Sequence, residues 1–273
     1  MFRRKHHQLI GSILQQLNGD LLREHHCYFG GGTAIALLQN EYRESIDIDF
    51  LVSNKEHYRE LRHLLMSTTG IYTIAKEGSK LLLARDIRAD QYGIRTMLQS
   101  ADVAIKFEIV LEGRIEFDTP DPIDSIEGIT TLTRLDLLTS KLLANSDRWN
   151  DQAVFSRDII DLVMLDPGKE ELNKALLKAY SAYGDSIHKD LHKALEALLV
   201  NNDKLEKCIN WLKIDTPKAL LWQKLYDLKS AHMAILNRKM DQKIYQAGKS
   251  QVKNFIEQDL KDIDHILNYL KDK

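Results

Sequence analysis

The stretch YFGGGTAIALLQNEYRESIDIDFLV, residues 28–52, constrains the fold of this chain more than any other. Consecutive glycines allow a tight turn and a close approach of the backbone to a ligand, because they lack a Cβ atom. The apolar segment that follows can form a helix whose N-terminus, with its exposed N–H groups and helix dipole, favours a phosphate. The alternative is an ordinary turn. The glycines are Gly30, Gly31 and Gly32.

The segment IDIDF, residues 46–50, alternates apolar and acidic side chains. Alternate residues of a strand lie on opposite faces, so Asp47 and Asp49 share one face. Two carboxylates so close repel each other and raise the pKa of one of them, a cost that Mg²⁺ would remove. An edge strand with a solvated acidic face is the alternative. The apolar face is formed by Ile46, Ile48 and Phe50.

A third acid lies in the alternating segment VAIKFEIVL, residues 103–111. Glu108 lies between core-type residues, and a charge on a largely apolar strand needs a partner. If this strand lies beside the first, Glu108 can bind the same metal ions as Asp47 and Asp49. Two ions about 3.5–4 Å apart would then activate an attacking hydroxyl and stabilise leaving pyrophosphate. The alternative is a solvated face shared by Lys106 and Glu108.

Composition limits the class of protein. The formal net charge of −2 over 273 residues argues against a broadly basic nucleic-acid coat, although a local basic patch remains compatible with it. Two cysteines form neither a disulfide framework nor a metal-ligand spacing, which favours a reducing compartment. No apolar run is long enough to span a bilayer. We therefore expect a cytoplasmic protein without a membrane partner.

The pattern of hydrophobic residues changes once along the chain. Short β-type runs occur between residues 28 and 117, and long apolar-periodic segments dominate from about residue 130. These patterns predict an α+β domain over residues 1–128 and a helical domain over residues 129–273 that contributes to the active-site cleft. A segment rich in Pro, Asp and Gly, FDTPDPIDSIEG, lies at the boundary.

The motif GGTAIAL…RESIDID resembles the first motif of the AbiEii/AbiGii-type nucleotidyltransferase toxins, members of the polymerase-beta-like nucleotidyltransferase superfamily. The matching residues are Gly31, Gly32, Thr33, Ala34, Ala36, Leu37, Arg43, Ser45, Asp47, Ile48 and Asp49. The second motif, Lys-x-Asp or Lys-x-Glu on a strand, matches Lys106 and Glu108. Lys141 in LDLLTSKLLA matches the third, a lysine on a helix. The fourth motif corresponds to Arg157, Asp158, Asp161 and Leu162.

The resemblance covers residues 28–165 and implies a nucleotidyltransferase-type mixed sheet with flanking helices. It implies metal binding and catalysis by Asp47, Asp49 and Glu108, and nucleotide binding by Gly31, Gly32, Thr33, Arg43, Ser45 and Lys141. Lys141 is a compact cation that can meet a triphosphate as a point charge.

The sequence leaves alternative roles open for Asp158 and Arg43. Asp158 is expected to act in catalysis, where it could orient or deprotonate the acceptor, although it could instead pair with Arg148 or Lys141. Arg43 could lie near the phosphates or pair with Glu41 or Asp47. Asp161, three residues after Asp158 and therefore on the same helix face, is expected to be structural.

The implied activity is transfer of a nucleoside monophosphate from an NTP to an acceptor hydroxyl, with Mg²⁺ or Mn²⁺ as cofactor. The resemblance further implies the toxin of a toxin–antitoxin or phage-defence system, with tRNA as the acceptor and a cognate antitoxin as a partner. The alternatives are transfer to a small molecule or a protein, and a non-catalytic nucleotide-binding or interaction module. The intact acids argue against the last alternative.

The C-terminal residues 218–273 hold 11 Lys or Arg and 7 Asp or Glu. This excess of positive charge predicts a helical face that could hold an RNA backbone by releasing its counterions. A solvated face is the alternative reading. The residues chosen to represent the face are Lys224, Lys229, Arg238 and Lys239.

Overall fold

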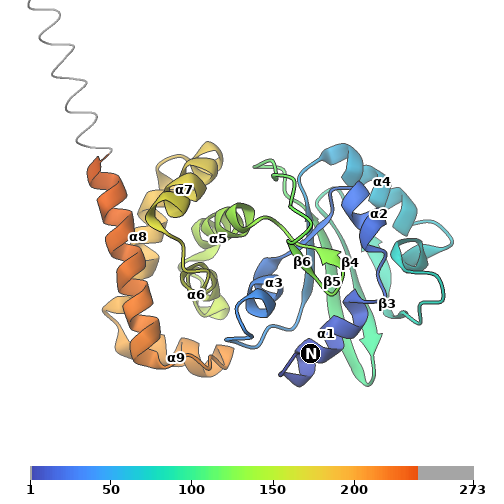
Figure 1. The fold of residues 1–273 in the computed structure, drawn as a ribbon, viewed down its shortest axis with the longest axis horizontal. Coiled ribbons are helices and arrows are strands. Elements are labelled where there is room, and N and C mark those ends of the chain that lie inside the picture. The colour runs from blue at the N-terminus through green and yellow to red at the C-terminus, as the bar shows by residue number, and fades with distance from the viewer. Residues whose placement is uncertain (1, 239–273) are drawn as a thin grey trace, which may run out of the picture. The chain divides into compact units, whose positions relative to one another are not determined.

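A computed structural model describes residues 2–238 and confirms the α+β class (Figure 1). Five strands form a mixed sheet in the order β1-β2-β5-β4-β3. The central pair β2 and β5 is parallel, whereas the other neighbours are antiparallel. A separate hairpin of β6 and β7 follows. The strands are β1 (Tyr28–Gly30), β2 (Ile48–Val52), β3 (Leu82–Ala89), β4 (Gly93–Ser100), β5 (Val103–Leu111), β6 (Ser125–Ile126) and β7 (Ile129–Thr130).

Helices flank the sheet and then make up the rest of the described chain. Figure 1 shows α3 between the sheet and the group formed by α5 and α6, and α3 contacts all three of these parts. The α-helices are α1 (Lys5–Leu14), α2 (Gly19–Glu24), α3 (Gly31–Leu38), α4 (Lys55–Leu65), α5 (Arg134–Arg148), α6 (Arg157–Met164), α7 (Lys169–Tyr183), α8 (Ser186–Leu199) and α9 (Asn202–Leu212). Two short 3₁₀ helices are η1 (Gly70–Ile74) and η2 (Gln152–Val154).

Side-chain alternation places the core on one face of the sheet. Phe50 in β2 lies between Phe29 of β1 and Phe107 of β5, with ring centroids 5.6 and 5.5 Å apart, and all three rings are buried. Apolar residues of α1 and α4 belong to the same core cluster. The intervening residues of β2 and β5, which include Asp49 and Glu108, therefore face away from this core.

Side chains of Asn54 and Thr133 cap the N-termini of α4 and α5. The side chain of Asn54 accepts hydrogen bonds from the Glu56 and His57 N–H groups at the start of α4. Thr133 accepts one from the Asp136 N–H at the start of α5. Such caps satisfy N–H groups that have no partner within the helix.

Two details differ from the sequence expectation. The strand begins at Ile48 and not at residue 46, and Ile46 is 52% exposed, so it does not share the buried apolar face. The β-type run YTIA forms most of η1 and contributes a single bridge through Ala75. Asp47 therefore lies in the loop before β2, and only Asp49 of the pair lies within the strand.

The change from strands to helices falls between Thr130 and Arg134. Residues up to Lys229 nevertheless form one compact unit, and a second unit begins at Ser230. The proposed division between residues 128 and 129 stays a prediction. The chain is helical again from residue 218 to 238. Within the described residues, no helix combines the length and apolarity needed to cross a membrane.

The packing of Phe50 gives a first prediction. Phe50→Ala should lower the free energy of unfolding by about 3–5 kcal/mol, because it removes a buried ring and leaves a cavity. Leu82→Ala is the matched control, since Leu82 is 58% exposed on the edge strand β3. It should change the free energy by about 0.5 kcal/mol or less. Chemical denaturation measures both values, and equal losses would contradict this account of the core.

Candidate active site

The parallel strands β2 and β5 bring two predicted acids side by side. Asp49 is the register partner of Glu108, and on its other side it is paired with Gly30 of β1. Asp47 lies two residues before Asp49, at the entrance to β2. The sheet thus places Asp49 beside Glu108, and Asp47 precedes Asp49 by two residues in the adjoining loop.

Asp49 is in an unfavourable electrostatic position. Burial raises the pKa of Asp49, and the charges of Asp47 and Glu108 raise it further. The charges of Lys106 and Lys141 act in the opposite direction but do not cancel the shift. Among residues 2–238, no hydrogen bond or ion pair engages the carboxylate of either Asp47 or Asp49. These oxygens therefore remain available to an external cation.

Glu108 already has two cationic partners. Its Oε1 lies 2.8 Å from the Nε of Arg95 on β4, and its Oε2 is bonded to the ammonium of Lys106. Arg95 also contacts Asp90 at 3.0 Å, which ties Glu108 to the turn between β3 and β4. In the described part of the chain, no three His, Cys, Asp or Glu side chains form a ready-made set of metal ligands.

Two of the glycines make room for charged side chains. Gly31 has φ +67°, and a Cβ atom there would lie 2.6 Å from Oδ2 of Asp49. A Cβ on Gly32 would lie 2.2 Å from Nη2 of Arg43 and 3.1 Å from Oδ2 of Asp161. Any larger residue would displace these groups, so packing alone requires both glycines. Their predicted role in phosphate binding stays a prediction.

Arg43 forms a buried ion pair with Asp161 of α6. Its Nε and Nη2 atoms lie 2.6 and 2.9 Å from the two carboxylate oxygens, and Arg43 is only 3% exposed. The Tyr42 hydroxyl donates to the same carboxylate. Neither expected partner of Arg43, Glu41 or Asp47, forms the pair, because the side chain turns toward α6.

Glu41 instead secures the N-terminus of the chain. Its carboxylate accepts hydrogen bonds from the backbone N–H groups of Arg3 and Arg4 and from Nδ1 of His7 at 2.9 Å. The N–H of Ser45 donates to Nε2 of His7, which fixes the neutral form of the imidazole. Burial lowers the pKa of His7, in agreement with that form.

Thr33 and Ser45 are joined directly. The Thr33 hydroxyl donates to the Ser45 hydroxyl at 2.8 Å and connects α3 to the loop that carries Asp47. Together with the bond from Ser45 to His7, this contact holds the loop at two points. These contacts fix the loop that carries Asp47, and the predicted role of Thr33 and Ser45 in nucleotide binding stays a prediction.

Lys141 and Asp158 belong to the same buried network. The Lys141 ammonium lies 3.0 Å from Asp158 and 2.7 Å from Asp161. Arg148 contacts Asp158 at 2.7 and 3.0 Å. Burial alone would raise the pKa of Asp158, but the charges of Lys141 and Arg148 lower it. The geometry thus favours the pairing alternative for Asp158, since a base should have a pKa near the operating pH.

Sequence reasoning missed Arg95 and His7. Arg95 is the register partner of Glu108 across β4 and β5. The alternation of buried Ile94, Thr96 and Leu98 with more exposed residues could have revealed this strand. His7 gave no such signal, because its partners are more than 30 residues away.

The proposed C-terminal basic face is partly neutralised. Lys224 forms an ion pair with Asp166 at 2.9 Å, and Lys229 pairs with Glu196. Lys239 lies outside the described residues. Paired lysines have less charge to offer a nucleic acid, which weakens the case for RNA binding at Lys224 and Lys229.

An α+β fold whose mixed sheet carries paired acids fits the nucleotidyltransferase class. Residues 12–268 match the family described as nucleotidyl transferase AbiEii toxin, type IV toxin–antitoxin system, and the chain belongs to this family. No curated protein matches the chain.

Two solved structures from Helicobacter pylori match this chain. One is a candidate nucleotidyltransferase with 19% identity and a TM-score of 0.45, matched over 85% of this chain and 94% of its own. The other is JHP933, with 20% identity and a TM-score of 0.46, matched over 90% and 96% respectively.

The buried network gives a second prediction. Asp161→Asn should lower the free energy of unfolding by about 3–5 kcal/mol, because it leaves Arg43 and Lys141 buried without their shared carboxylate. Asp166→Asn is the control. Its pair with Lys224 is exposed, with 74% of the aspartate side chain accessible, and should contribute about 0–1 kcal/mol. Denaturant titration at neutral pH decides, and a similar small loss in both variants would contradict the structural role of Asp161.

Proposed function

We propose that this nucleotidyltransferase toxin is Mg²⁺-dependent and transfers a nucleoside monophosphate from an NTP to a hydroxyl of tRNA. The observation that carries the proposal is the carboxylate of Asp49, partly buried beside Asp47 and Glu108 with a raised pKa and available oxygens. A carboxylate buried beside other carboxylates is energetically unfavourable unless a cation binds to it. The position of Asp49 therefore supports a cation-binding role.

The residues fit a divalent cation. Asp47 and Asp49 offer hard, available oxygen ligands, which suit Mg²⁺. Glu108 can complete the set by exchanging one of its cationic partners, Arg95 or Lys106, for the metal. When bound, the ion would neutralise phosphate charge and activate the acceptor hydroxyl.

The reaction forms a bond from the acceptor oxygen to the α-phosphorus and breaks the bond to the β-phosphate. Pyrophosphate leaves, and the hydroxyl proton passes to solvent. The chain supplies positive charge near the triphosphate, because the network of Arg43, Lys141 and Arg148 has three cations against the two carboxylates of Asp158 and Asp161. This excess of positive charge supports the predicted role of Lys141 in nucleotide binding, because its electrostatic field would attract the triphosphate.

We also infer a cognate antitoxin as a partner, because the family is that of type IV toxins. A reducing compartment, the cytoplasm, is the inferred location, since Cys27 and Cys208 are both free and buried. Transfer to a small molecule or a protein remains the rival acceptor class.

The third prediction identifies the acceptor. The protein is incubated with each labelled NTP in turn, Mg²⁺ and total RNA, and the location of the label is determined. We expect label in tRNA with release of pyrophosphate, and no transfer by Asp47→Ala or Asp49→Ala. The fold of both variants should persist, and their stability without Mg²⁺ should hold or rise, because carboxylate repulsion is relieved. Label in protein or small molecules would exclude tRNA, and turnover by either variant would refute the acid assignment.

The fourth prediction separates binding from chemistry at the third acid. Glu108→Gln keeps the shape of the side chain and removes its charge. NTP affinity should survive while the transfer rate falls by orders of magnitude, as expected for a lost metal ligand. Glu77→Gln is the control, because Glu77 is exposed and forms no ion pair within the described residues. An unchanged rate in Glu108→Gln would make Glu108 a structural residue.

A further inference from the structure

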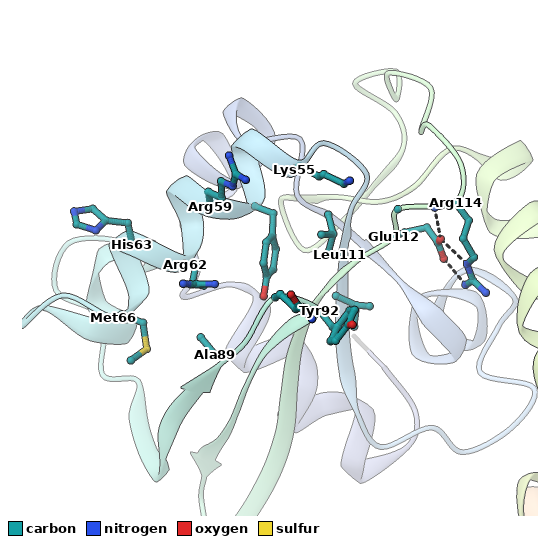
Figure 2. A pocket seen from close by; sticks show the side chains of 14 residues that line it. Lys55, Arg59, Arg62, His63, Met66, Ala89, Tyr92, Leu111, Glu112 and Arg114 are labelled. Atoms are coloured by element: carbon teal, nitrogen blue, oxygen red, sulfur yellow. Dashed lines mark hydrogen bonds and ion pairs between the residues drawn. The ribbon is translucent and has the colours of Figure 1, made fainter. Parts of the chain in front are cut away.

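A wide basic cleft lies between α4 and the turn that joins β3 to β4 (Figure 2). Its volume is 1310 Å³. Tyr58, Tyr92 and the end of β5 contribute apolar surface to its wall. The basic residues that line it are Lys55, Arg59, Arg62, His63 and Arg114.

Most of the positive charge in this cleft is uncompensated. Within residues 2–238, neither Lys55 nor Arg59 forms an ion pair, and Arg62 reaches only the backbone carbonyl of Asp90 at 3.4 Å. Arg114 is the exception, since it pairs with the one acid of the lining, Glu112. The cleft therefore offers free cations, in contrast to the paired Lys224 and Lys229 of the C-terminal helix.

The spacing of these cations suits a phosphate chain. Lys55, Arg59 and Arg62 follow each other at intervals of four and three residues, so they share one face of α4. Seven residues of helix rise about 10 Å, the length over which a single nucleic-acid strand presents roughly three phosphates. A small anion would need only one of these positions.

An aromatic ring stands beside the cations. Tyr92 is 65% exposed at the tip of the turn between β3 and β4. The carboxylate of Asp90 accepts hydrogen bonds from the N–H groups of Tyr92 and Gly93, at 2.7 and 3.0 Å, and holds the tip in place. An exposed ring on a rigid turn offers a stacking surface for an unpaired base.

Strand β5 connects the cleft with the acid cluster. Val110 lines it and lies two residues beyond Glu108 on the same face of β5, a separation of roughly 7 Å along the strand. Asp90, whose backbone carbonyl faces Arg62, is also joined through Arg95 to Glu108. Contacts through Arg62, Asp90 and Arg95 thus connect the wall of the cleft with Glu108.

We infer that this cleft binds the phosphodiester backbone of a single-stranded end of the acceptor RNA, with Tyr92 stacked on one of its bases. The inference rests on the proposed function, because it assumes an RNA acceptor. It assigns the docking surface to α4 and the turn between β3 and β4, in place of the C-terminal helix.

The test compares two full-length variants of equal charge change. Lys55→Gln/Arg59→Gln/Arg62→Gln alters the cleft. Lys174→Gln/Lys189→Gln/Lys207→Gln is the control, since these lysines are exposed and form no ion pair within the described residues. The affinity for end-labelled, unfractionated tRNA is measured at several salt concentrations, and affinity for the labelled NTP that supports transfer is measured alongside.

The cleft variant should bind tRNA at least about tenfold more weakly than the control, and its log–log salt slope should fall by about two, as for lost phosphate contacts. Its NTP affinity and melting temperature should match those of the wild type. Tyr92→Ala should weaken tRNA binding by about fivefold or more, whereas Tyr92→Phe should not.

The outcomes distinguish failure of the proposed RNA acceptor from failure of the cleft as its docking surface. If the wild type neither binds nor labels tRNA, the RNA acceptor fails and the cleft assignment fails with it. If the wild type binds and labels tRNA but the cleft variant behaves like the control, only the cleft assignment is overturned. Equal loss of NTP binding would show that the cleft holds the nucleotide's phosphates and would overturn it as well.

Discussion

The buried ion pair between Arg43 and Asp161 is the interaction on which the arrangement of the site depends. It joins the loop after α3 to α6, across 118 residues of sequence. Neither charge could be buried alone, because an unpaired ion in a protein interior costs several kcal/mol. Lys141 contacts the same aspartate and brings α5 into the network. The loop that leads to Asp47 is thereby held against the helices by charge pairing, which requires a specific geometry that apolar packing would not.

The glycines belong to this constraint. Gly32 leaves space for the guanidinium of Arg43, and Gly31 leaves space for the carboxylate of Asp49. This turn therefore accommodates Arg43, which is paired with Asp161, and Asp49, which has no ion-pair partner in the described chain. Asp161 and Asp49 differ in the direction of their pKa shifts. The pKa of Asp161 is lowered because the charges of Arg43 and Lys141 outweigh the effect of burial, whereas that of Asp49 is raised by burial and by neighbouring acids. Ion pairing within the protein thus accounts for Asp161, whereas Asp49 is the position at which the proposed cation would act.

Local patterns predicted the parts of the site that lie within single strands. The alternation around Asp49 and Glu108 predicted their strands and shared face, and the register of β2 with β5 places the two residues side by side. β4 was not predicted, although Ile94, Thr96 and Leu98 alternate there with more exposed residues. The partner of Arg43 could not be found either. A bond between a loop and a distant helix leaves no periodic signal, and Glu41 and Asp47 were closer in sequence.

Pairing also decides which charges remain for a substrate. A lysine excess in the C-terminal segment suggested an RNA surface, but the ion pairs of Lys224 and Lys229 reduce the field there. Lys55, Arg59 and Arg62 of α4 have no such partners within the described chain, so a nearly neutral protein can still present a strongly positive surface at one place. That surface and the acid cluster are joined through β5 and Arg95. An RNA backbone in the inferred cleft would be attracted by the cations of α4, whereas the acid cluster would repel phosphate unless a cation is bound. Attraction and repulsion in this order would allow the backbone to bind while only a metal-loaded site accepts the terminal hydroxyl.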